Sequence, residues 1–457
     1  MNNRNNNRST ISRRRFVQNT VKGTLALALT PAAFACSSRG RSGERVRIAH
    51  IGVGDRGTHE LQYYLLPVRD ALNVAVCDVH KDRRENAAAL INKFYSGINE
   101  KVPACEAFPD FNEILHRKDI DAVHITTPDH WHVPLAIMAA RAGKHIMLAK
   151  PLGLSYPEYQ ILAKELKASN VKFHYGTQQR TSDHMYLGYN LIREGAIGDI
   201  EKAEVWAPGK NPVENPLCNE VPVPPDFDYD RWTGPAPLRP YCPERVTNNG
   251  SWFQNDYSIG FLGGWGAHPL DILVWILKEK VSAGYTAEGT GQYWQGPGIY
   301  NNILSWDVSC KYDNGFGLHF VSDDIALAGM LDYRDIKETN GTTFFGSRGW
   351  ISLSRSSAQS NIPEINSRLN DFPKTDDGWI KSEKNTMGQA FVDVINGKIK
   401  ELCPLEDAII SDTISHMGDI AIRTGRKVTW DPAKGEVAGD FEANKLYVRE
   451  MRDPYKV

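Results

Sequence analysis

The stretch Val46-Arg47-Ile48-Ala49-His50-Ile51-Gly52-Val53-Gly54-Asp55-Arg56-Gly57 decides the fold of this chain. A short β-prone run passes directly into Gly-x-Gly-x-x-Gly, and a helix-forming stretch from His59 to Leu65 follows. In such a unit the first glycine makes the tight turn, the second lets a phosphate approach the backbone, and the third lets the helix close on the strand. The sequence therefore predicts a dinucleotide-binding turn, in which the helix N-terminus offers free N–H groups to a phosphate.

A second apolar strand, Leu72 to Cys77, ends in Asp78, which lies 26 residues after Gly52. A carboxylate at this spacing binds the adenosine ribose hydroxyls and repels a 2′-phosphate, so NAD is predicted over NADP. Three basic residues within 81–84 follow closely and weigh in the opposite direction. The alternative is a structural glycine turn with a solvated aspartate, which requires the strand, the glycines and the acid to coincide by chance.

The alternation of strands and helices continues through residue 177, which predicts an α/β fold with a doubly wound parallel sheet. The expected strands are 122–125, 145–148 and 171–175, and the expected helices are 133–141 and 156–168. Ligands of such sheets lie beyond the carboxyl ends of the strands. The segments to inspect are therefore 126–132, 149–151 and 176–180.

The second half of the chain predicts an α+β domain with a large, open, mostly antiparallel sheet and helices on one face. Strand-like runs occur at 286–294, 303–311, 316–321 and 342–353. The proline-rich segment 208–258 is interpreted as an ordered loop over the active site or as a subunit contact, with disorder as the alternative. The polar stretch 355–384 predicts a second long loop.

The expected division of the chain is 1–44 as signal or tether, 45–177 as NAD-binding domain, and 178–457 as substrate and oligomerisation domain.

The N-terminus predicts export rather than folded structure. Ser12-Arg13-Arg14-Arg15-Phe16 precedes an apolar run over residues 21–34 and resembles a twin-arginine signal. The run is too short to span a bilayer permanently. It ends in Ala33-Phe34-Ala35-Cys36, which fits either peptidase cleavage or lipidation of Cys36, and lipidation is slightly favoured. The expected location is the periplasm, with a membrane anchor in the lipidated case; a disordered basic tail is the alternative.

Composition excludes several classes of partner. The net charge of −2 and the absence of a basic stripe interleaved with aromatic residues argue against nucleic acid. The cysteines show no Cys-x-x-Cys spacing, so no metal cluster is indicated. In an exported protein some of them could form disulfides, but the sequence does not assign the pairs.

The strand-end motifs resemble those of the Gfo/Idh/MocA oxidoreductases. The resemblance spans nearly all of the chain after the signal. It rests on Gly52 to Gly57, Thr127-Pro128 with His132, Lys150-Pro151, Trp232-Thr233-Gly234-Pro235, Gly264-Trp265-Gly266-Ala267-His268-Pro269-Leu270-Asp271, Gly349-Trp350-Ile351, and a closing helix from Glu406 to Thr424.

This resemblance implies the roles of individual residues. Lys150 is expected to contact the substrate hydroxyl and the nicotinamide side, and His268 to accept the alcohol proton. Asp271, three residues on in the same helix, is expected to hold the tautomer of His268 and stabilise its charged form. The alternative for His268 is a core histidine at a helix cap. The expected cofactor contacts are Gly52, Val53, Gly54, Arg56, Gly57, Asp78, Thr126, Pro128, His132 and Lys150, and the expected substrate contacts are Gln178, Arg180 and Trp265.

Two positions depart from the family pattern. Ala149 stands where the family usually has a glutamate, so a partner for Lys150 is missing, and Gly264 stands where many members have an aspartate.

The predicted function is an NAD-dependent oxidoreductase with tightly bound NAD that oxidises a ring hydroxyl of a sugar or glycoside, carbon 3 being the expected position. The alternative is a glycosidase that oxidises the sugar transiently and eliminates the aglycone; Lys150-Pro151 favours the dehydrogenase. A non-enzymatic NAD-sensing role is a third reading, and a homo-oligomer through the C-terminal sheet is expected.

Overall fold

The computed structural model describes residues 44–209, 214–247, 250–370 and 387–457. The twin-arginine motif and Cys36 lie outside these residues, so export and lipidation stay predictions. Within the described ranges no helix is both long and apolar enough to cross a membrane. The two sheets described below lie in a single compact unit.

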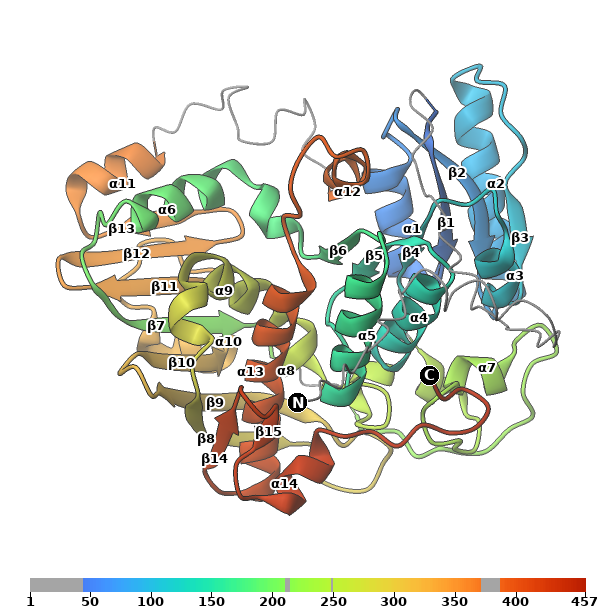
Figure 1. Cartoon of the computed structure of the whole chain (residues 1–457). Coiled ribbons are helices and arrows are strands. Elements are labelled where there is room, and N and C mark those ends of the chain that lie inside the picture. Colours follow the sequence, from blue (N-terminus) through green and yellow to red (C-terminus); the bar gives the residue numbers. More distant parts are fainter. Residues whose placement is uncertain (1–43, 210–213, 248–249, 371–386) are drawn as a thin grey trace, which may run out of the picture. The chain divides into compact units, whose positions relative to one another are not determined.

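The first sheet is the parallel, six-stranded sheet that the sequence predicts, with the order β3-β2-β1-β4-β5-β6 (Figure 1). The strand order reverses between β1 and β4, so a crevice forms at their carboxyl ends. The strands are β1 (Val46–Ile51), β2 (Ala71–Cys77), β3 (Glu106–Phe108), β4 (Ala122–Ile125), β5 (His145–Ala149) and β6 (Phe173–Gly176). The helices are α1 (Asp55–Glu60), α2 (Lys81–Gly97), α3 (Phe111–His116), α4 (Asp129–Arg141) and α5 (Tyr156–Ala168).

The predicted element boundaries shift in two informative places. The helix expected over 133–141 begins four residues earlier, at Asp129. The apolar pattern did not mark this start, because the first turn of the helix carries polar residues. The helix expected from His59 to Leu65 is instead the end of α1 followed by a π-helical turn over Leu61–Leu65. The starts of α4 and α1 place the polar residues Asp129 and Asp55 at the crevice.

The second sheet has nine strands and is antiparallel except for the β7–β10 pair. Its order is β13-β12-β11-β7-β10-β9-β8-β14-β15. The strands are β7 (Ile200–Ala207), β8 (Tyr285–Tyr293), β9 (Ile303–Tyr312), β10 (Gly317–Ser322), β11 (Gly341–Gly346), β12 (Gly349–Ser354), β13 (Ala358–Ser360), β14 (Val428–Asp431) and β15 (Glu436–Val437). This confirms the predicted fold class.

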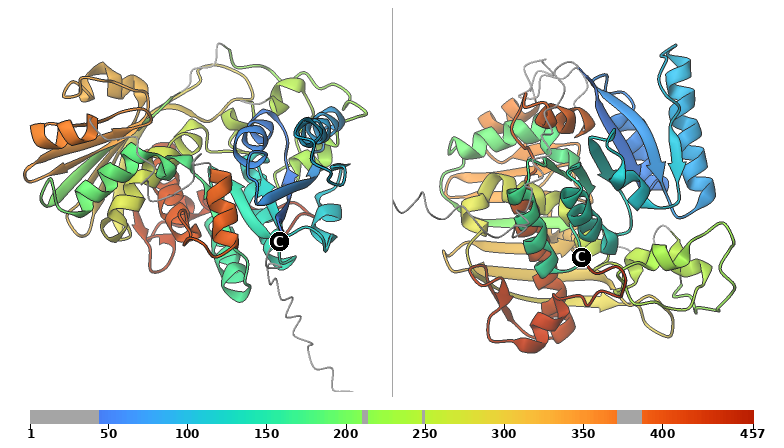
Figure 2. Two further views of the ribbon diagram at one scale, coloured as in Figure 1. Left: turned by 90° about the horizontal axis from the view of Figure 1, so that it is seen from above. Right: turned by 45° about the vertical axis from the view of Figure 1, so that its right-hand side comes forward.

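Helices gather on one face of this sheet, as Figure 2 shows from above. The longest, α13 (Leu405–Thr424), contacts α5 and β6 of the first domain as well as α9 and β8, and so joins the two sheets (Figure 1). The other helices are α6 (Asp183–Arg193), α7 (Tyr229–Thr233), α8 (Phe261–Gly264), α9 (Ala267–Val281), α10 (Asp323–Ile325), α11 (Pro363–Asn370), α12 (Met387–Ile395) and α14 (Phe441–Leu446).

The prediction of a long loop over 355–384 is wrong in its described part. Strand β13 and helix α11 occupy much of 358–370, and residues 371–386 are not described. The sequence did not predict either element, because both are rich in serine and asparagine or other polar residues. Strand β13 is also short, and its side chains Gln359 and Ser360 are buried through hydrogen bonds rather than apolar packing.

Candidate active site

A cavity of about 390 Å³ opens at the carboxyl ends of β1, β4 and β5 and is lined by residues of both domains. The glycine turn forms one wall. Gly52 has a φ of +85°, and a Cβ there would lie 2.7 Å from the carbonyl oxygen of Thr126. A Cβ at Gly57 would collide with the carbonyl oxygen of Gly52. These glycines are therefore required by close backbone approach, as in a dinucleotide-binding turn.

Asp78 is fixed at the end of β2 by two backbone amides. Its Oδ2 accepts from the N–H of Val53 at 2.9 Å, and its Oδ1 accepts from the N–H of His80 at 2.9 Å. Asp78 lines the cavity, and each carboxylate oxygen retains a lone pair for a ribose hydroxyl. Val53 itself is buried in the core, and its amide serves Asp78. Arg83 lies beside Gly54 at the same wall.

Arg56 of α1 points to the cavity while its guanidinium is held by a buried acid. Glu60 accepts from Arg56 at 2.6 Å and from His124 at 2.8 Å. These partners outweigh the effect of burial and lower the pKa of Glu60. Arg56 thus carries its positive charge at a fixed position next to the glycine turn.

Thr126, Pro128 and His132 line the cavity from the β4–α4 connection. The two ring nitrogens of His132 lie 2.6 Å from the carbonyl oxygen of Pro151 and 2.8 Å from that of Thr127. His132 therefore ties the β4 end to the β5 end. It positions the backbone that carries Lys150.

Lys150 follows β5 and reaches across to the second domain. Its Nζ donates to the carbonyl oxygen of Gly264 at 2.8 Å and lies 4.4 Å from the ring centre of Trp252. A side chain at Gly264 would collide with the Trp252 ring, so the glycine is required where many members of the resembled family have aspartate. A carbonyl and an aromatic face thus orient the lysine without the missing glutamate. Burial lowers the pKa of Lys150 to about 8, against the opposing charge of Asp129.

His268 lies in the first turn of α9 and lines the same cavity, 3% exposed. Burial first, and then the cations Lys150, Arg355 and Arg56, lower the pKa of His268 well below its usual value. Its Nδ1 is buried and has no hydrogen-bond partner among the described residues. The imidazole is therefore neutral and keeps an acceptor nitrogen in the site.

Asp271 does not orient His268, contrary to the expected role. Both of its oxygens accept from Arg180, at 2.8 and 2.6 Å, and Thr177 donates to it at 2.8 Å. Arg180 also donates to Asp407 at 2.8 Å and is 1% exposed, so it does not line the cavity as a substrate contact either. The two side chains form a buried ion pair that joins the β6 end to α9.

The remaining expected substrate contacts, Gln178 and Trp265, do line the cavity. Trp265 lies edge-on to His268, with ring centres 5.7 Å apart, and the Oε1 of Gln178 is buried without a partner in the described residues. An unpaired acceptor at a cavity wall is available for a ligand hydroxyl.

Sequence reasoning assigned no role to several cavity residues, among them Asp129, Trp252 and Arg355. Asp129 is 3% exposed and accepts from the indole of Trp252 at 3.0 Å and from Ser258 at 2.7 Å. Burial raises its pKa, and nearby His132 opposes that shift most. Only Asp129 carried a signal, because it begins α4 within the segment that follows β4; no sequence pattern marked Trp252, which lies in a short 3-10 helix, or Arg355, which follows β12.

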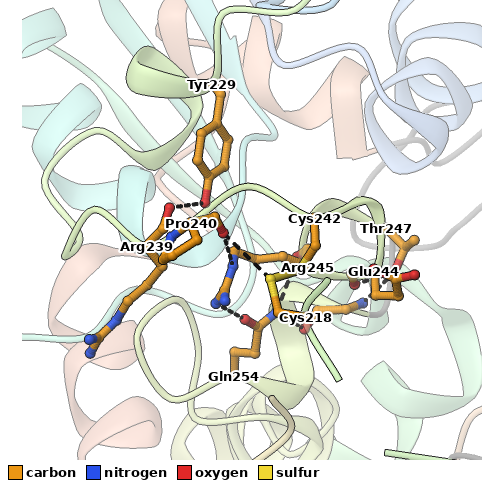
Figure 3. Close-up of a disulfide and its surroundings, with 10 residues drawn as sticks. Cys218, Tyr229, Arg239, Pro240, Cys242, Glu244, Arg245, Thr247 and Gln254 are labelled. Carbon is orange, nitrogen blue, oxygen red and sulfur yellow. Dashed lines mark hydrogen bonds between the residues drawn. A yellow bond between two sulfur atoms is a disulfide. The ribbon is translucent and has the colours of Figure 1, made fainter. Parts of the chain in front are cut away.

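The proline-rich segment lies over the cavity, as one of its interpretations predicts. Cys218 and Cys242 form a disulfide, a pairing that the sequence left open (Figure 3). Beside it the buried Arg245 donates to the carbonyl of Pro240 and to Gln254 (Figure 3). These contacts order the backbone from which Val246, Thr247, Ser251 and Trp252 reach the cavity.

Two family models match the chain. Residues 46–177 match "Oxidoreductase family, NAD-binding Rossmann fold", and residues 209–457 match "Oxidoreductase family, C-terminal alpha/beta domain", both of the Gfo/Idh/MocA type. The chain belongs to the Gfo/Idh/MocA oxidoreductase family. Its Rossmann domain binds NAD, and the glycine turn and Asp78 fit that cofactor.

Curated relatives in this family cover only part of the chain. An alpha-N-acetylgalactosaminidase of Shewanella oneidensis is 30% identical over 167 residues, which are 35% of this chain and 34% of that protein. A glycosyl hydrolase family 109 protein of Saccharopolyspora erythraea is 36% identical over 115 residues, 25% of this chain and 24% of that protein. The chain thus matches about a third or less of the length of these relatives.

Solved structures share the fold at low identity. Scyllo-inositol dehydrogenase of Lactobacillus casei, solved with NAD(H) and scyllo-inositol, has a TM-score of 0.55 at 17% identity and covers 84% of this chain and 99% of its own. Aldose-aldose oxidoreductase of Caulobacter crescentus has a TM-score of 0.58 at 15% identity, with coverages of 84% and 99%. This likeness concerns the fold alone.

Proposed function

We propose that the protein is an NAD-dependent oxidoreductase that acts on a ring hydroxyl of a sugar or glycoside, with carbon 3 as the expected position. The observation that carries the proposal is the meeting of neutral His268 and cationic Lys150 in the cavity that the glycine turn and Asp78 also line. Trp252 and Trp265 add flat aromatic walls, which suit the apolar faces of a sugar ring.

The residues divide the work of alcohol oxidation between them. The glycine turn and Asp78 would hold NAD, which would supply the acceptor for the hydride that leaves the carbon. The neutral imidazole of His268 accepts the hydroxyl proton, and the ammonium of Lys150 donates a hydrogen bond to the oxygen as negative charge develops there. Each positioned group of this kind contributes about 10²–10⁴-fold to the rate.

The second candidate is an NAD-dependent glycosidase that works by transient oxidation and elimination. The glycosidases among the curated relatives favour it. Elimination needs a further base for the carbon-bound proton beside the ketone. Asp129 is a buried cavity carboxylate that acts on Lys150, and each of its oxygens accepts one hydrogen bond and retains a lone pair. The dehydrogenase stays the first candidate because of Lys150-Pro151, which the glycosidase branch of the resembled family usually lacks.

The proposal includes the place of action. Twin-arginine export carries folded proteins, so NAD is loaded before export, is retained, and is re-oxidised on the enzyme by a keto-sugar acceptor or by return of hydride to the substrate. Protein from a periplasmic or membrane fraction is then expected to release about one dinucleotide per chain on denaturation. Protein that is isolated empty, and is active only with added NAD, would contradict the retained cofactor.

One experiment separates the candidates. Cofactor-loaded protein is incubated with a panel of glycosides while the absorbance of reduced nicotinamide and the released aglycone are followed together, and His268→Ala serves as the matched control. Reduction without aglycone supports the dehydrogenase. Aglycone release without net reduction supports the glycosidase. No reaction of either kind across the panel contradicts both.

A further inference from the structure

Arg355 is a cavity cation without a hydrogen-bonded or ion-paired acid among the described residues, although the carboxylate of Glu338 acts on it electrostatically. It follows β12, is exposed, and its guanidinium carbon lies 5.0 Å from the ring centre of Trp265. Within the described ranges its side chain makes no hydrogen bond or ion pair, whereas Arg56 pairs with Glu60. Arg83 is likewise unpaired there, but it lies beside Gly54 of the cofactor turn. Arg355 belongs to the other domain, next to the wall that holds His268.

Two further cations lie close to Arg355. Lys150 lies 5.8 Å from the ring centre of the same Trp265, and Arg56 acts on both His268 and Arg355 electrostatically. The charged residues that influence His268 are all cations, although Asp129 and Glu60 act on Lys150. Because the Arg355 side chain is exposed and holds no acid within the described ranges, its guanidinium is free to bind an anion that enters the cavity.

We propose that the natural substrate is an anionic sugar whose carboxylate or phosphate group binds Arg355 while a ring hydroxyl lies at Lys150 and His268. This inference rests on the proposed function and specifies its substrate class. A guanidinium offers two parallel N–H donors that match a carboxylate or phosphate. Trp265 lies beside both Arg355 and Lys150, so one sugar stacked on this ring can reach both cations.

The other available anion is the cofactor diphosphate. Arg56 of the glycine turn acts on Arg355 electrostatically, so a diphosphate near the turn is a competing source of negative charge. The two sources differ in what the loss of Arg355 does. Loss of a diphosphate contact lowers the retained NAD, whereas loss of a substrate contact leaves the NAD content unchanged.

The test uses full-length, cofactor-loaded protein and pairs of substrates that differ in charge: methyl glucuronide against methyl glucoside, and glucose 6-phosphate against glucose. The variants are Arg355→Gln, Arg355→Lys and, as a matched surface control, Arg193→Gln, whose arginine forms an exposed ion pair with Glu279. Measured are kcat/KM, the dinucleotide released per chain, and calorimetric binding of each sugar to the His268→Ala protein, which does not depend on turnover.

The expected result is a preference of the wild type for the charged sugar of at least one pair. Arg355→Gln should lower kcat/KM and affinity for the charged sugar about 10- to 100-fold, the range for a hydrogen bond to a charged group. The same two quantities for the neutral sugar should stay within about threefold of the wild type. Arg355→Lys should retain part of the preference, and Arg193→Gln all of it.

Equal binding of charged and neutral sugars overturns the inference, and so does loss of NAD from the Arg355→Gln protein. The proposed function fails separately, if no sugar reduces the bound cofactor. In that case the calorimetric comparison still decides whether Arg355 binds an anionic sugar.

Discussion

The buried pair of Arg180 and Asp271 allows a decisive test, because sequence and structure assign it different roles. The family resemblance makes Asp271 a partner of His268, whereas the structure makes it a partner of Arg180, with two bonds of 2.6 and 2.8 Å. Asp407 binds the same guanidinium at 2.8 Å. The perturbations are Asp271→Asn, which keeps the shape of the side chain, and Arg180→Met.

The magnitudes follow from what each change leaves unpaired. Arg180→Met leaves the buried carboxylate of Asp271 without its cation, whereas Asp407 keeps an ion pair with Lys278 at 2.9 Å. Breaking a buried pair in this way costs about 3–5 kcal/mol in free energy of unfolding. Asp271→Asn leaves Arg180 its bond to Asp407, so its cost lies below that of Arg180→Met. At about 2 °C per kcal/mol for a large domain, Arg180→Met lowers the thermal midpoint by about 6–10 °C.

The assay compares the unfolding midpoint and kcat of the same preparations, at a temperature at which every variant is folded. We expect Asp271→Asn to lose stability and keep most of its kcat. The double variant should show a coupling energy of about 0.5–3 kcal/mol, as for residues in direct contact. A variant Asp271→Asn with an unchanged midpoint and a kcat as low as that of His268→Ala would refute the structural assignment.

Further predictions concern the cavity itself. His268→Ala and Lys150→Met should each lower kcat about 10²–10⁴-fold, as measured by steady-state kinetics. Thermal unfolding should give an unchanged midpoint for His268→Ala and an unchanged or higher midpoint for Lys150→Met. Asp78→Ala should weaken NAD binding and relax the discrimination against NADP. The measurement is a titration of NAD and of NADP into protein that has been unfolded to release its cofactor and then refolded. The buried ammonium of Lys150 should make the wild type gain stability as the pH rises from about 8 to 10.5, because over this window the unfolded state binds the proton and the folded state does not.

Each of these expectations has an outcome that contradicts it. Retained turnover in His268→Ala would assign the proton acceptor elsewhere. An unchanged cofactor preference in Asp78→Ala would show that another residue, such as Arg83, discriminates. A stability difference between the wild type and Lys150→Met that stays constant across the alkaline window would show that the lysine is not desolvated.

The first domain could be predicted because its signals are local. A parallel strand that is buried on both faces is a continuous apolar run, and the residue after it lies at the ligand edge by geometry alone. Gly52 and Asp78 directly follow predicted strands, Lys150 lies two residues after the predicted strand 145–148, and all three line the cavity. The second domain supplied its sheet through the hairpin around residue 314. Its cavity residue His268 lies in α9 and was found through the family motif, whereas no periodicity marks Trp252 or Arg355.

The spacing of His268 and Asp271 shows a different limit of sequence reasoning. Residues three apart share a helix face, but each side chain binds the groups it meets, and Asp271 meets a buried arginine from the β6 end. His268 is left among cations, so a proton that it accepts adds charge beside Lys150 and Arg355. Among the described residues no acid acts on His268, although Asp129 and Glu60 act on Lys150 and Glu338 acts on Arg355. On the proposed function, a substrate anion at Arg355 would offset part of the added charge and would help the histidine to act as the base.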